Sequence, residues 1–291
     1  MSIDADTLVD WFGTAGRDLP WRRPDCTPWG VLVSEIMLQQ TPVARVLPIW
    51  AEWLARWPRP SAMAAASQGE VLRAWGRLGY PRRALRLHAA AGAIAEQHGD
   101  QVPSDVDTLL ALPGIGAYTA RAVAAFAYGK RAPVVDTNVR RVVARAVHGA
   151  GDAGPPSTTR DLADVEAILP DTDRAAARFS AALMELGALV CTARSPRCAD
   201  CPLLDGCAWH RAGKPAYTGP AKPVQKYAGT DRHVRGLLLA VLRETEGPVP
   251  KSRLDVVWSQ AGQRDRCLDS LLVDGLVEQT ADGRFALPGE H

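Results

Sequence analysis

The sequence lacks the segments that mark membrane-spanning and exported proteins. No run of 18 apolar residues occurs anywhere in its 291 residues. The stretch from Met1 to Gly16 carries three aspartates and has no basic region before an apolar core. We therefore expect a soluble, cytoplasmic protein with no membrane association.

A strong net charge is a second absence. The formal charge of +2 is too small to indicate a nucleic-acid partner by itself. The charge is uneven, however, because the stretch from Val71 to Ile94 carries five arginines and no acidic residue. Such a stretch fits a solvated helix face as well as a phosphate-binding surface. The five are Arg73, Arg77, Arg82, Arg83 and Arg86.

Cysteines are few, and they are not spread through the chain as a disulfide framework would be. Four of the six lie within one short window with the spacing C-x6-C-x2-C-x5-C. Structural zinc sites usually pair two short C-x2-C segments, and only one is present here. On chemistry alone, the four cysteines could bind either a zinc ion or an iron–sulfur cluster. The four are Cys191, Cys198, Cys201 and Cys207.

Strand patterns are scarce before the C-terminal part of the chain. Helical periodicity, capping residues and helix breakers alternate through residues 1–213. An apolar content of 47% supports a sizeable core and argues against disorder. The sequence therefore predicts an all-α body with an appended C-terminal part.

One of the predicted helices carries a carboxylate among apolar side chains. Residues Trp29–Gln40 are apolar from Val31 to Leu38 except for Ser34 and Glu35. Burial disfavours the charged form, so a buried Glu35 would stay protonated near neutral pH and serve as a general acid. The alternative is a glutamate at the rim of the helix that reaches water.

A glycine turn precedes a second apolar helix. Leu112–Gly116 contains Gly114 and Gly116 directly before Tyr118–Tyr128. Glycine permits a tight turn, and the first N–H groups of the following helix form an anion site. Two helices joined in this way can hold a DNA phosphate without reading a base, although an ordinary turn would leave the same pattern.

A second carboxylate follows that helix. Asp136 comes directly after the apolar pair Val134 and Val135, and Arg140 and Arg141 follow it. An acid close to phosphate-binding groups is suggestive of catalysis. The alternative is that Asp136 only caps the next helix.

Together, five motifs resemble those of the MutY-type adenine DNA glycosylases, which belong to the helix-hairpin-helix or endonuclease III superfamily. The resemblance covers about residues 11–207 in unbroken order, including the cysteine spacing, which matches the 4Fe-4S cluster loop of that superfamily. It implies a helix-hairpin-helix glycosylase fold with a 4Fe-4S cluster. The motifs are Val33–Thr41, Leu78–Tyr80, Leu112–Gly116, Val135–Val139 and Met184–Ala188.

The resemblance also implies a reaction. Such enzymes flip adenine out of double-stranded DNA where it is mispaired with 8-oxoguanine or guanine, and hydrolyse its N-glycosidic bond. Glu35 would protonate adenine at N7 and later handle the proton of the attacking water. Asp136 would stabilise the oxocarbenium-like sugar by its charge or by a transient covalent bond.

Supporting roles follow in the same way. Tyr118, Asn138 and Glu185 would help to hold the site. Gln40 and Tyr80 would occupy or support the gap in the DNA, and Gly114 and Gly116 would contact a phosphate. At the position of Tyr118, bifunctional endonuclease III enzymes carry a lysine that forms a Schiff base. Tyrosine cannot do so, and we expect a monofunctional enzyme that leaves the strand uncut.

The chain departs from the family pattern in two places. Pro81 stands where many relatives have a second aromatic residue. The family also usually ends in a Nudix-like domain of more than a hundred residues, credited with reading 8-oxoguanine, whereas only residues 229–291 follow the linker here. Three helical segments followed by a hairpin around Asp282-Gly283 suggest a small winged-helix-like module. It could bind DNA, dock another protein or only pack.

The sequence thus predicts a core over residues 1–213, a linker over 214–228 and a module over 229–291. Within the core, a helical barrel covers about residues 22–130, and the N-terminal helix joins residues 131–213 in an iron–sulfur half. We expect a monomer. Two other functions compete: an endonuclease III-like or thymine/uracil mismatch glycosylase, and a non-catalytic iron–sulfur redox sensor that binds DNA.

Overall fold

The computed structural model describes residues 3–219 and 227–290. The predicted linker, residues 214–228, therefore falls partly outside the described residues. The chain forms two compact units, each built from several segments of the sequence. Unit 1 comprises residues 1–32, 104–110 and 116–221, and unit 2 comprises residues 33–103, 111–115 and 222–291. The predicted division into core, barrel and iron–sulfur half stays a prediction.

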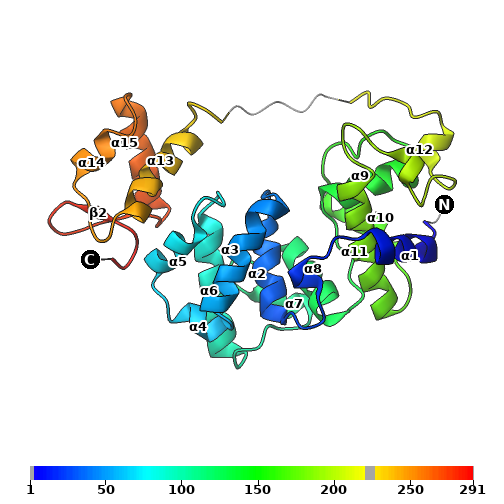
Figure 1. The fold of residues 1–291 in the computed structure, drawn as a ribbon, viewed down its shortest axis with the longest axis horizontal. Coiled ribbons are helices and arrows are strands. Elements are labelled where there is room, and N and C mark those ends of the chain that lie inside the picture. The colour runs from blue at the N-terminus through cyan, green and yellow to red at the C-terminus, as the bar shows by residue number, and fades with distance from the viewer. Residues whose placement is uncertain (1–2, 220–226, 291) are drawn as a thin grey trace. The chain divides into compact units, whose positions relative to one another are not determined.

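Unit 1 is organised around one long helix, α11, which packs against α1, α8 and α9. Figure 1 shows α9, α10 and α11 together in green, with α1 in blue beside them. The helices of unit 1 are α1 (Ala5–Ala15), α8 (Ala117–Tyr128), α9 (Thr137–Ala146), α10 (Thr158–Glu166), α11 (Asp173–Leu189) and α12 (Ala208–Arg211), with 3-10 turns at Pro20–Arg22 and Cys198–Asp200.

The core of unit 1 follows from helical spacing. Phe179, Leu183 and Leu186 recur every three or four residues along α11 and are fully buried. They face Val139 of α9 and Leu8 of α1 within one apolar cluster. This packing fixes the N-terminal end of α9, where Asp136 lies.

Unit 2 begins within the helix that carries Glu35 and continues through the segment that follows it. Its interior is aromatic: the rings of Trp53 and Trp57 meet edge to face at 5.0 Å, and those of Trp53 and Trp75 at 5.4 Å. Its helices before the module are α3 (Val43–Arg56), α4 (Pro60–Ala64), α5 (Gln68–Trp75) and α6 (Arg82–Gln97). Two helices cross between units along the chain, α2 (Pro28–Leu38) and α7 (Val106–Ala111).

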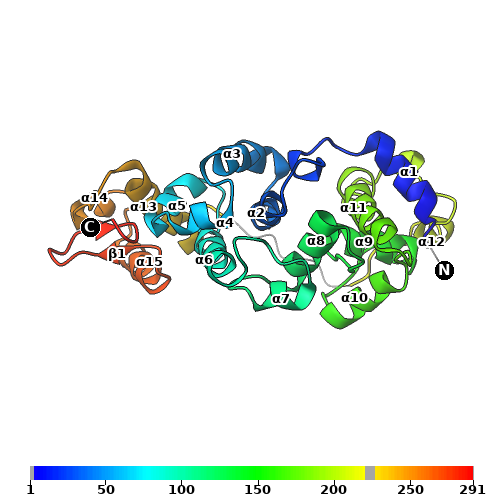
Figure 2. The same ribbon diagram turned by 90° about the horizontal axis from the view of Figure 1, so that it is seen from below.

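The C-terminal module, residues 227–290, has the elements predicted for it. Helices α13 (Asp231–Glu244), α14 (Lys251–Asp255) and α15 (Ala261–Val273) precede an antiparallel hairpin of β1 (Glu278–Gln279) and β2 (Phe285–Ala286). Gly283 turns the hairpin with φ +81°, and Val249 pairs with Phe285. Figure 2 shows the three helices around this short hairpin. The likeness to winged-helix domains stays a prediction.

The described helices include none suited to a bilayer. Over residues 3–219 and 227–290, no helix is both long enough and apolar enough to cross a membrane.

Candidate functional site

Asp136 is held rigidly at the beginning of α9. Its Oδ1 accepts the backbone N–H groups of Asn138 at 2.8 Å and Val139 at 2.7 Å, and its Oδ2 accepts the side-chain amide of Asn138 at 2.7 Å. Asp136 is thus the N-cap of α9, as one prediction had it. Burial raises the pKa of its carboxyl group, and the hydrogen bonds from Val139 and Asn138 oppose that shift. The cap does not exclude catalysis, because it also fixes the carboxylate in one orientation.

Asn138 is in turn positioned by α11. A Cβ added to Gly187 would lie 2.7 Å from the Cβ of Asn138, so only glycine allows this approach of the two helices. Arg141 donates to the side-chain oxygen of Asn138 at 2.8 Å and to the carbonyl of Gly187 at 2.6 Å. The amide of Asn138 is therefore oriented with its nitrogen toward Asp136.

Glu185 lies one half-turn earlier on α11 and is fully buried. Arg17 binds both of its carboxylate oxygens, at 2.7 Å each, and Arg22 binds one of them at 2.9 Å. Burial alone would raise the pKa of Glu185, but the hydrogen bonds from Arg17 and Arg22 lower it to about 2. Glu185 therefore anchors the segment after α1 to α11, and the two arginines are partners that the sequence reasoning did not single out.

Tyr118 lies in the first turn of α8, which begins one residue earlier than predicted and ends at Tyr128 as predicted. It packs, with Phe126 and Met184, against a small apolar cluster that includes Val134. Val134 is fully buried and precedes Asp136 by two residues. The four residues Tyr118, Asp136, Asn138 and Glu185 therefore share one unit and are linked to one another through α8, α9 and α11.

Glu35 belongs to the other unit and lies on α2. Its exposure is only 5%, within an unbroken run of buried residues from Val31 to Met37. The alternative of a rim glutamate that reaches water is therefore wrong. The helix ends at Leu38, two residues before the predicted end.

Gln40 and Tyr80 share an unusual backbone conformation. Gln40 follows α2 with φ +55°, and Tyr80 precedes α6 with φ +48°. Non-glycine residues rarely adopt this left-handed region, and such strain is concentrated at functional sites. Both side chains are exposed. The structure thus gives a property common to the two residues that were predicted to enter the DNA.

A single arginine holds both turns. Arg83 donates Nη1 to the carbonyls of Ile36, Met37 and Gln39, and Nη2 to the hydroxyl of Thr41 and the carbonyl of Gly79. Its guanidinium also lies over the Tyr80 ring, 5.5 Å from the centroid. Burial lowers its pKa to about 10, so it remains charged at neutral pH.

Sequence reasoning grouped Arg83 with a basic face and missed this role. A signal was present, because Arg83 lies four residues before Leu87 and is in helical phase with the buried residues of α6. A cation on the apolar face of a helix must find polar partners. Here those partners are the carbonyls at the end of α2 and at the turn before Tyr80.

The glycine turn between α7 and α8 has the predicted geometry. Gly114 adopts φ +73°, and a Cβ there would lie 2.6 Å from the Cβ of Arg86. Gly116 is the N-cap of the twelve-residue helix α8, with extended backbone. Gly114 is therefore required both by its dihedral angle and by the approach of Arg86, whereas Gly116 is required by neither.

The four clustered cysteines line one small cavity in unit 1. None forms a disulfide. In the described part of the chain, no three His, Cys, Asp or Glu side chains meet closely enough for a single metal ion. Thiols arranged around a cavity fit a polynuclear cluster, in which each iron takes one thiolate. Arg145, Trp209 and His210 complete the wall together with Val190, Pro196 and Leu204.

Arg145 fastens this loop to α9. It is 4% exposed, donates to the carbonyls of Thr192 at 2.7 Å and Ala193 at 3.2 Å, and reaches the sulfur of Cys191 at 3.4 Å. Its guanidinium lies 4.7 Å from the ring centroid of Trp209. Burial raises the pKa of Cys191, while the nearby Arg145 opposes this shift. A buried cation of this kind suits an anionic cluster.

Comparison with known families supports both parts of this description. A family model described as "HhH-GPD superfamily base excision DNA repair protein" matches residues 33–165. A second model, "Iron-sulfur binding domain of endonuclease III", matches residues 191–207. The first match includes Glu35 and Asp136, and the second begins and ends at the outer cysteines.

The chain is also similar to individual proteins of this kind. Over 291 residues the chain is 67% identical to the adenine DNA glycosylase of Mycolicibacterium smegmatis, covering 100% of this chain and 98% of the relative. It is 62% identical over 289 residues to that of Mycobacterium tuberculosis, covering 99% and 94%. A solved thermostable thymine-DNA glycosylase matches 72% of this chain and 95% of its own, with a TM-score of 0.64 and 27% identity.

Proposed function

This chain belongs to the adenine DNA glycosylases of the HhH-GPD base excision repair superfamily, and from that premise we propose that it removes adenine mispaired with 8-oxoguanine or guanine by hydrolysis, leaving the strand uncut. The predicted family, the helical glycosylase fold and the 4Fe-4S cofactor are confirmed by the matches. The opposite base, the monofunctional reaction and the role of each residue belong to the proposal.

The observation that carries the proposal is the fixed carboxylate of Asp136. Loss of adenine leaves positive charge on the sugar, and a carboxylate already oriented by Asn138 and Val139 can stabilise that charge without reorganising. Its negative charge acts either through space or through a transient bond to the sugar, as in retaining glycosidases. In this proposal Asn138 positions the carboxylate of Asp136. Glu185 supports the site indirectly, by anchoring α11.

Glu35 takes the role of general acid. A carboxyl group at 5% exposure in an apolar helix is suited to hold a proton and transfer it to N7 of adenine, which makes the base a better leaving group. The same group then accepts a proton from the attacking water. Glu35 thus acts on the base, and Asp136 acts on the sugar.

Base flipping requires groups that fill the gap and groups that grip the backbone. Gln40 and Tyr80 are exposed on strained turns, which suits side chains that enter the stack. The N-terminal turn of α8, at Gly116, suits a DNA phosphate. Double-stranded DNA is accordingly the proposed partner, and the proposed location is the cytoplasm, at the nucleoid in a bacterial cell.

The strand is left uncut because α8 offers no amine. A β-elimination through a Schiff base needs a lysine, and position 118 carries tyrosine. The reaction then ends at the abasic site.

Cys191, Cys198, Cys201 and Cys207 are the proposed ligands of the 4Fe-4S cluster. These four thiolates would hold the cluster, which would then cross-link the segment that follows α11. Arg145 orients the loop through the carbonyls of Thr192 and Ala193.

Two rivals make different predictions. A thymine or uracil mismatch glycosylase shares the fold, as the solved thymine-DNA glycosylase illustrates. A redox sensor would bind mismatched DNA and release no base. The presence of both Glu35 and Asp136 favours a catalytic enzyme over a non-catalytic redox sensor.

The test is single-turnover reaction with labelled duplexes that carry adenine opposite 8-oxoguanine, guanine or thymine, and thymine opposite guanine. Each product is analysed with and without alkali. We expect breaks only after alkali, fastest for adenine opposite 8-oxoguanine. Breaks without alkali would indicate a lyase, thymine release would favour the mismatch rival, and no release from any duplex would favour the sensor.

A further inference from the structure

The C-terminal module carries little charge that would attract DNA. Residues 227–290 contain eight lysines and arginines but ten aspartates and glutamates. A module that binds DNA by itself normally carries a basic patch. The charge of this module therefore suits a basic protein surface better than a phosphate backbone.

Such a surface lies in the same unit, at the basic stretch of α5 and α6. Arg73 binds Glu290 through two hydrogen bonds of 2.5 and 2.7 Å and also donates to the carbonyls of Arg243 and Thr245. Two further ion pairs link this stretch to the module, Arg77 with Glu244 at 3.6 Å and Arg82 with Asp274 at 3.2 Å.

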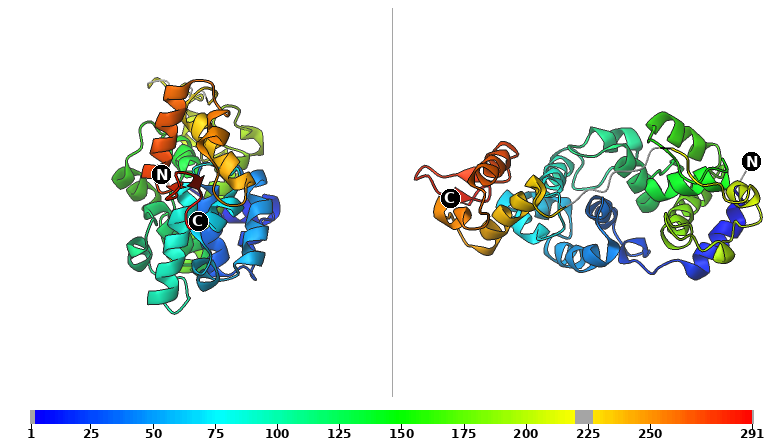
Figure 3. Two further views of the ribbon diagram at one scale, coloured as in Figure 1. Left: turned by 90° about the vertical axis from the view of Figure 1, so that its left-hand side faces the viewer. Right: turned by 90° about the horizontal axis from the view of Figure 1, so that it is seen from above.

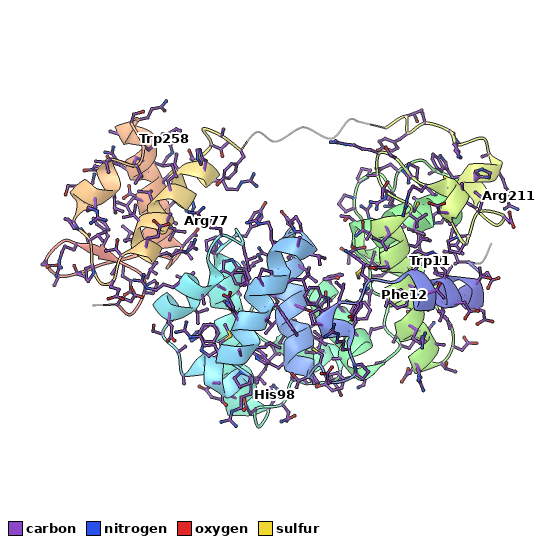
Figure 4. All side chains as sticks on the ribbon, viewed as in Figure 1. Trp11, Phe12, Arg77, His98, Arg211 and Trp258 are labelled. Carbon is purple, nitrogen blue, oxygen red and sulfur yellow. The ribbon has the colours of Figure 1, made fainter. Side chains whose placement is uncertain are left out.

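Arg77 is labelled in Figure 4, and the right-hand view of Figure 3 shows the gold helix α13 of the module next to the cyan helices. Backbone contacts add to these pairs. The N–H of Gly69 donates to the carbonyl of Pro288 at 2.9 Å, and Arg243 donates to the carbonyl of Gly76 at 2.6 Å. Three of the five arginines that drew attention in the sequence are thus engaged by the acidic module.

At the edge of this contact, the module reaches Tyr80. Arg232 of α13 donates Nη1 to the Tyr80 hydroxyl at 2.9 Å, and its guanidinium lies 5.8 Å from that ring and 5.1 Å from the ring of Tyr227. Tyr80 is 42% exposed and sits on a strained turn that Arg83 also holds.

We propose that Arg232 is a positioning residue for Tyr80: the module, docked on α5 and α6, holds the tyrosine in the orientation from which it enters the DNA. This inference rests on the proposed function, because Tyr80 is the wedge there. A side chain already fixed loses less conformational entropy on binding, so the contact favours recognition of the mismatch. The module then influences recognition through Tyr80 and not through its own contact with DNA.

A double-mutant cycle tests the proposal. Arg232→Ala, Tyr80→Phe and the double variant are compared with wild type in binding a mismatched duplex with a non-cleavable adenosine analogue, and a matched duplex. Tyr80→Phe keeps the ring and removes only the hydroxyl. Each single variant is expected to lose about three- to ten-fold in mismatch preference, the range of one exposed hydrogen bond. The double variant is expected to lose no more than the worse single.

Additive losses would overturn the proposal, because the two groups would then act independently. The salt dependence gives a second criterion. If Arg232 itself bound a phosphate, its removal would lower the slope of log Kd against log salt by about one, and Tyr80→Phe would not. A changed slope for Arg232→Ala alone would also overturn the proposal.

Arg253→Ala is the matched control. Arg253 is an exposed arginine of α14 in the same module, and its loss changes the net charge equally. It is expected to leave mismatch preference unchanged, and an equal loss would refute the assignment to Arg232. Adenine release by wild type, measured in parallel, distinguishes failure of this inference from failure of the proposed function. Release with an additive cycle refutes only this inference, whereas no release refutes the proposed function.

Discussion

Two carboxylates of unit 1 meet opposite environments. Glu185 is surrounded by the guanidinium groups of Arg17 and Arg22, so its pKa falls to about 2 and it serves as an anchor. Asp136 receives hydrogen bonds from neutral amides, and burial raises its pKa. A charge that is already neutralised by arginines cannot stabilise a cation in a reaction, whereas the charge of Asp136 can.

Replacement of Asp136 by asparagine separates stability from activity. We expect Asp136→Asn to slow adenine release by about 10²–10³-fold, because the stabilising charge is lost. Because the folded-state pKa is raised, wild type loses stability as pH rises from 3.8 through that pKa, and the variant does not. Asparagine can still accept the two backbone N–H groups, but its amide nitrogen would face the side-chain amide nitrogen of Asn138, so the third hydrogen bond is lost. The two effects oppose each other, and the melting temperature at neutral pH should fall by no more than about 4 °C.

A larger fall in melting temperature would mean that the cap needs the charge, and unchanged release would remove Asp136 from the mechanism. Thermal unfolding and single-turnover kinetics on the same preparation measure both.

In contrast to Asp136→Asn, the substitution Glu185→Gln should mainly lower the stability of the protein. Removing one partner of a buried ion pair leaves the arginines unmatched, and we expect a loss of about 3 kcal/mol in unfolding free energy near neutral pH. The lowered pKa means that this stabilisation is present above 4.5 and is lost as pH falls toward about 2. Urea unfolding at several pH values measures the difference between the two proteins.

The control for this prediction is Glu166→Gln, which breaks the more exposed pair with Arg131. We expect it to cost less than about 1 kcal/mol. If the Glu185 and Glu166 variants lose equal stability, Glu185 is not the anchor described above.

At the scale of elements, sequence periodicity predicted the presence of α2 and α8, because each is a continuous apolar run. Gln39 and Gln40 were assigned to α2, but the helix ends at Leu38 and Gln40 turns left-handed. That ending depends on Arg83, which binds the last carbonyls of α2 from a helix more than forty residues later. The local sequence around α2 cannot predict a contact with a residue so far along the chain.

The close approach of α9 and α11 gives a prediction for an element. Gly187→Ala would place a methyl group 2.7 Å from the Cβ of Asn138, so the helices must separate or Asn138 must turn. We expect a loss of about 1–3 kcal/mol in stability and slower adenine release, because Asn138 then orients Asp136 less well. Denaturant unfolding and single-turnover rates measure the two effects.

Gly92→Ala serves as the matched control. Gly92 lies inside α6 with no atom within 4 Å of an added Cβ. Alanine there should stabilise the helix by up to about 1 kcal/mol and leave release unchanged. Destabilisation by both substitutions would show that the effect at position 187 is not specific to Asn138.

At the scale of the whole molecule, the motifs predicted the family, the fold and the cofactor because they lie in continuous short segments. Glu35, Asp136 and the cysteines could all be named from the sequence. The catalytic roles of the two carboxylates and the ligand role of the cysteines are part of the proposal. The docking of the module could not be predicted, because Arg73 and Glu290 are far apart in sequence and both look like ordinary surface charges. The basic stretch suggested DNA, whereas three of its arginines bind the module.

The contact of Arg73 with Glu290 predicts the stability of this docking. The two side chains are 25% and 19% exposed, and their paired hydrogen bonds are charge-assisted. Glu290→Gln should cost about 2 kcal/mol in unfolding free energy, measured by denaturant titration. Asp282→Asn, which alters an exposed pair in the same module, should leave the unfolding free energy unchanged. Equal effects would argue against the docking.

The central claim is that this chain releases adenine by acid catalysis from Glu35, and one comparison tests it most directly. Wild type and Glu35→Gln are assayed with adenine opposite 8-oxoguanine, measuring duplex binding and free adenine in the same samples. We predict equal binding, release by wild type with breaks only after alkali, and release at least about 10²-fold slower in the variant. Release by Glu35→Gln at the wild-type rate, or none by wild type, would contradict the account.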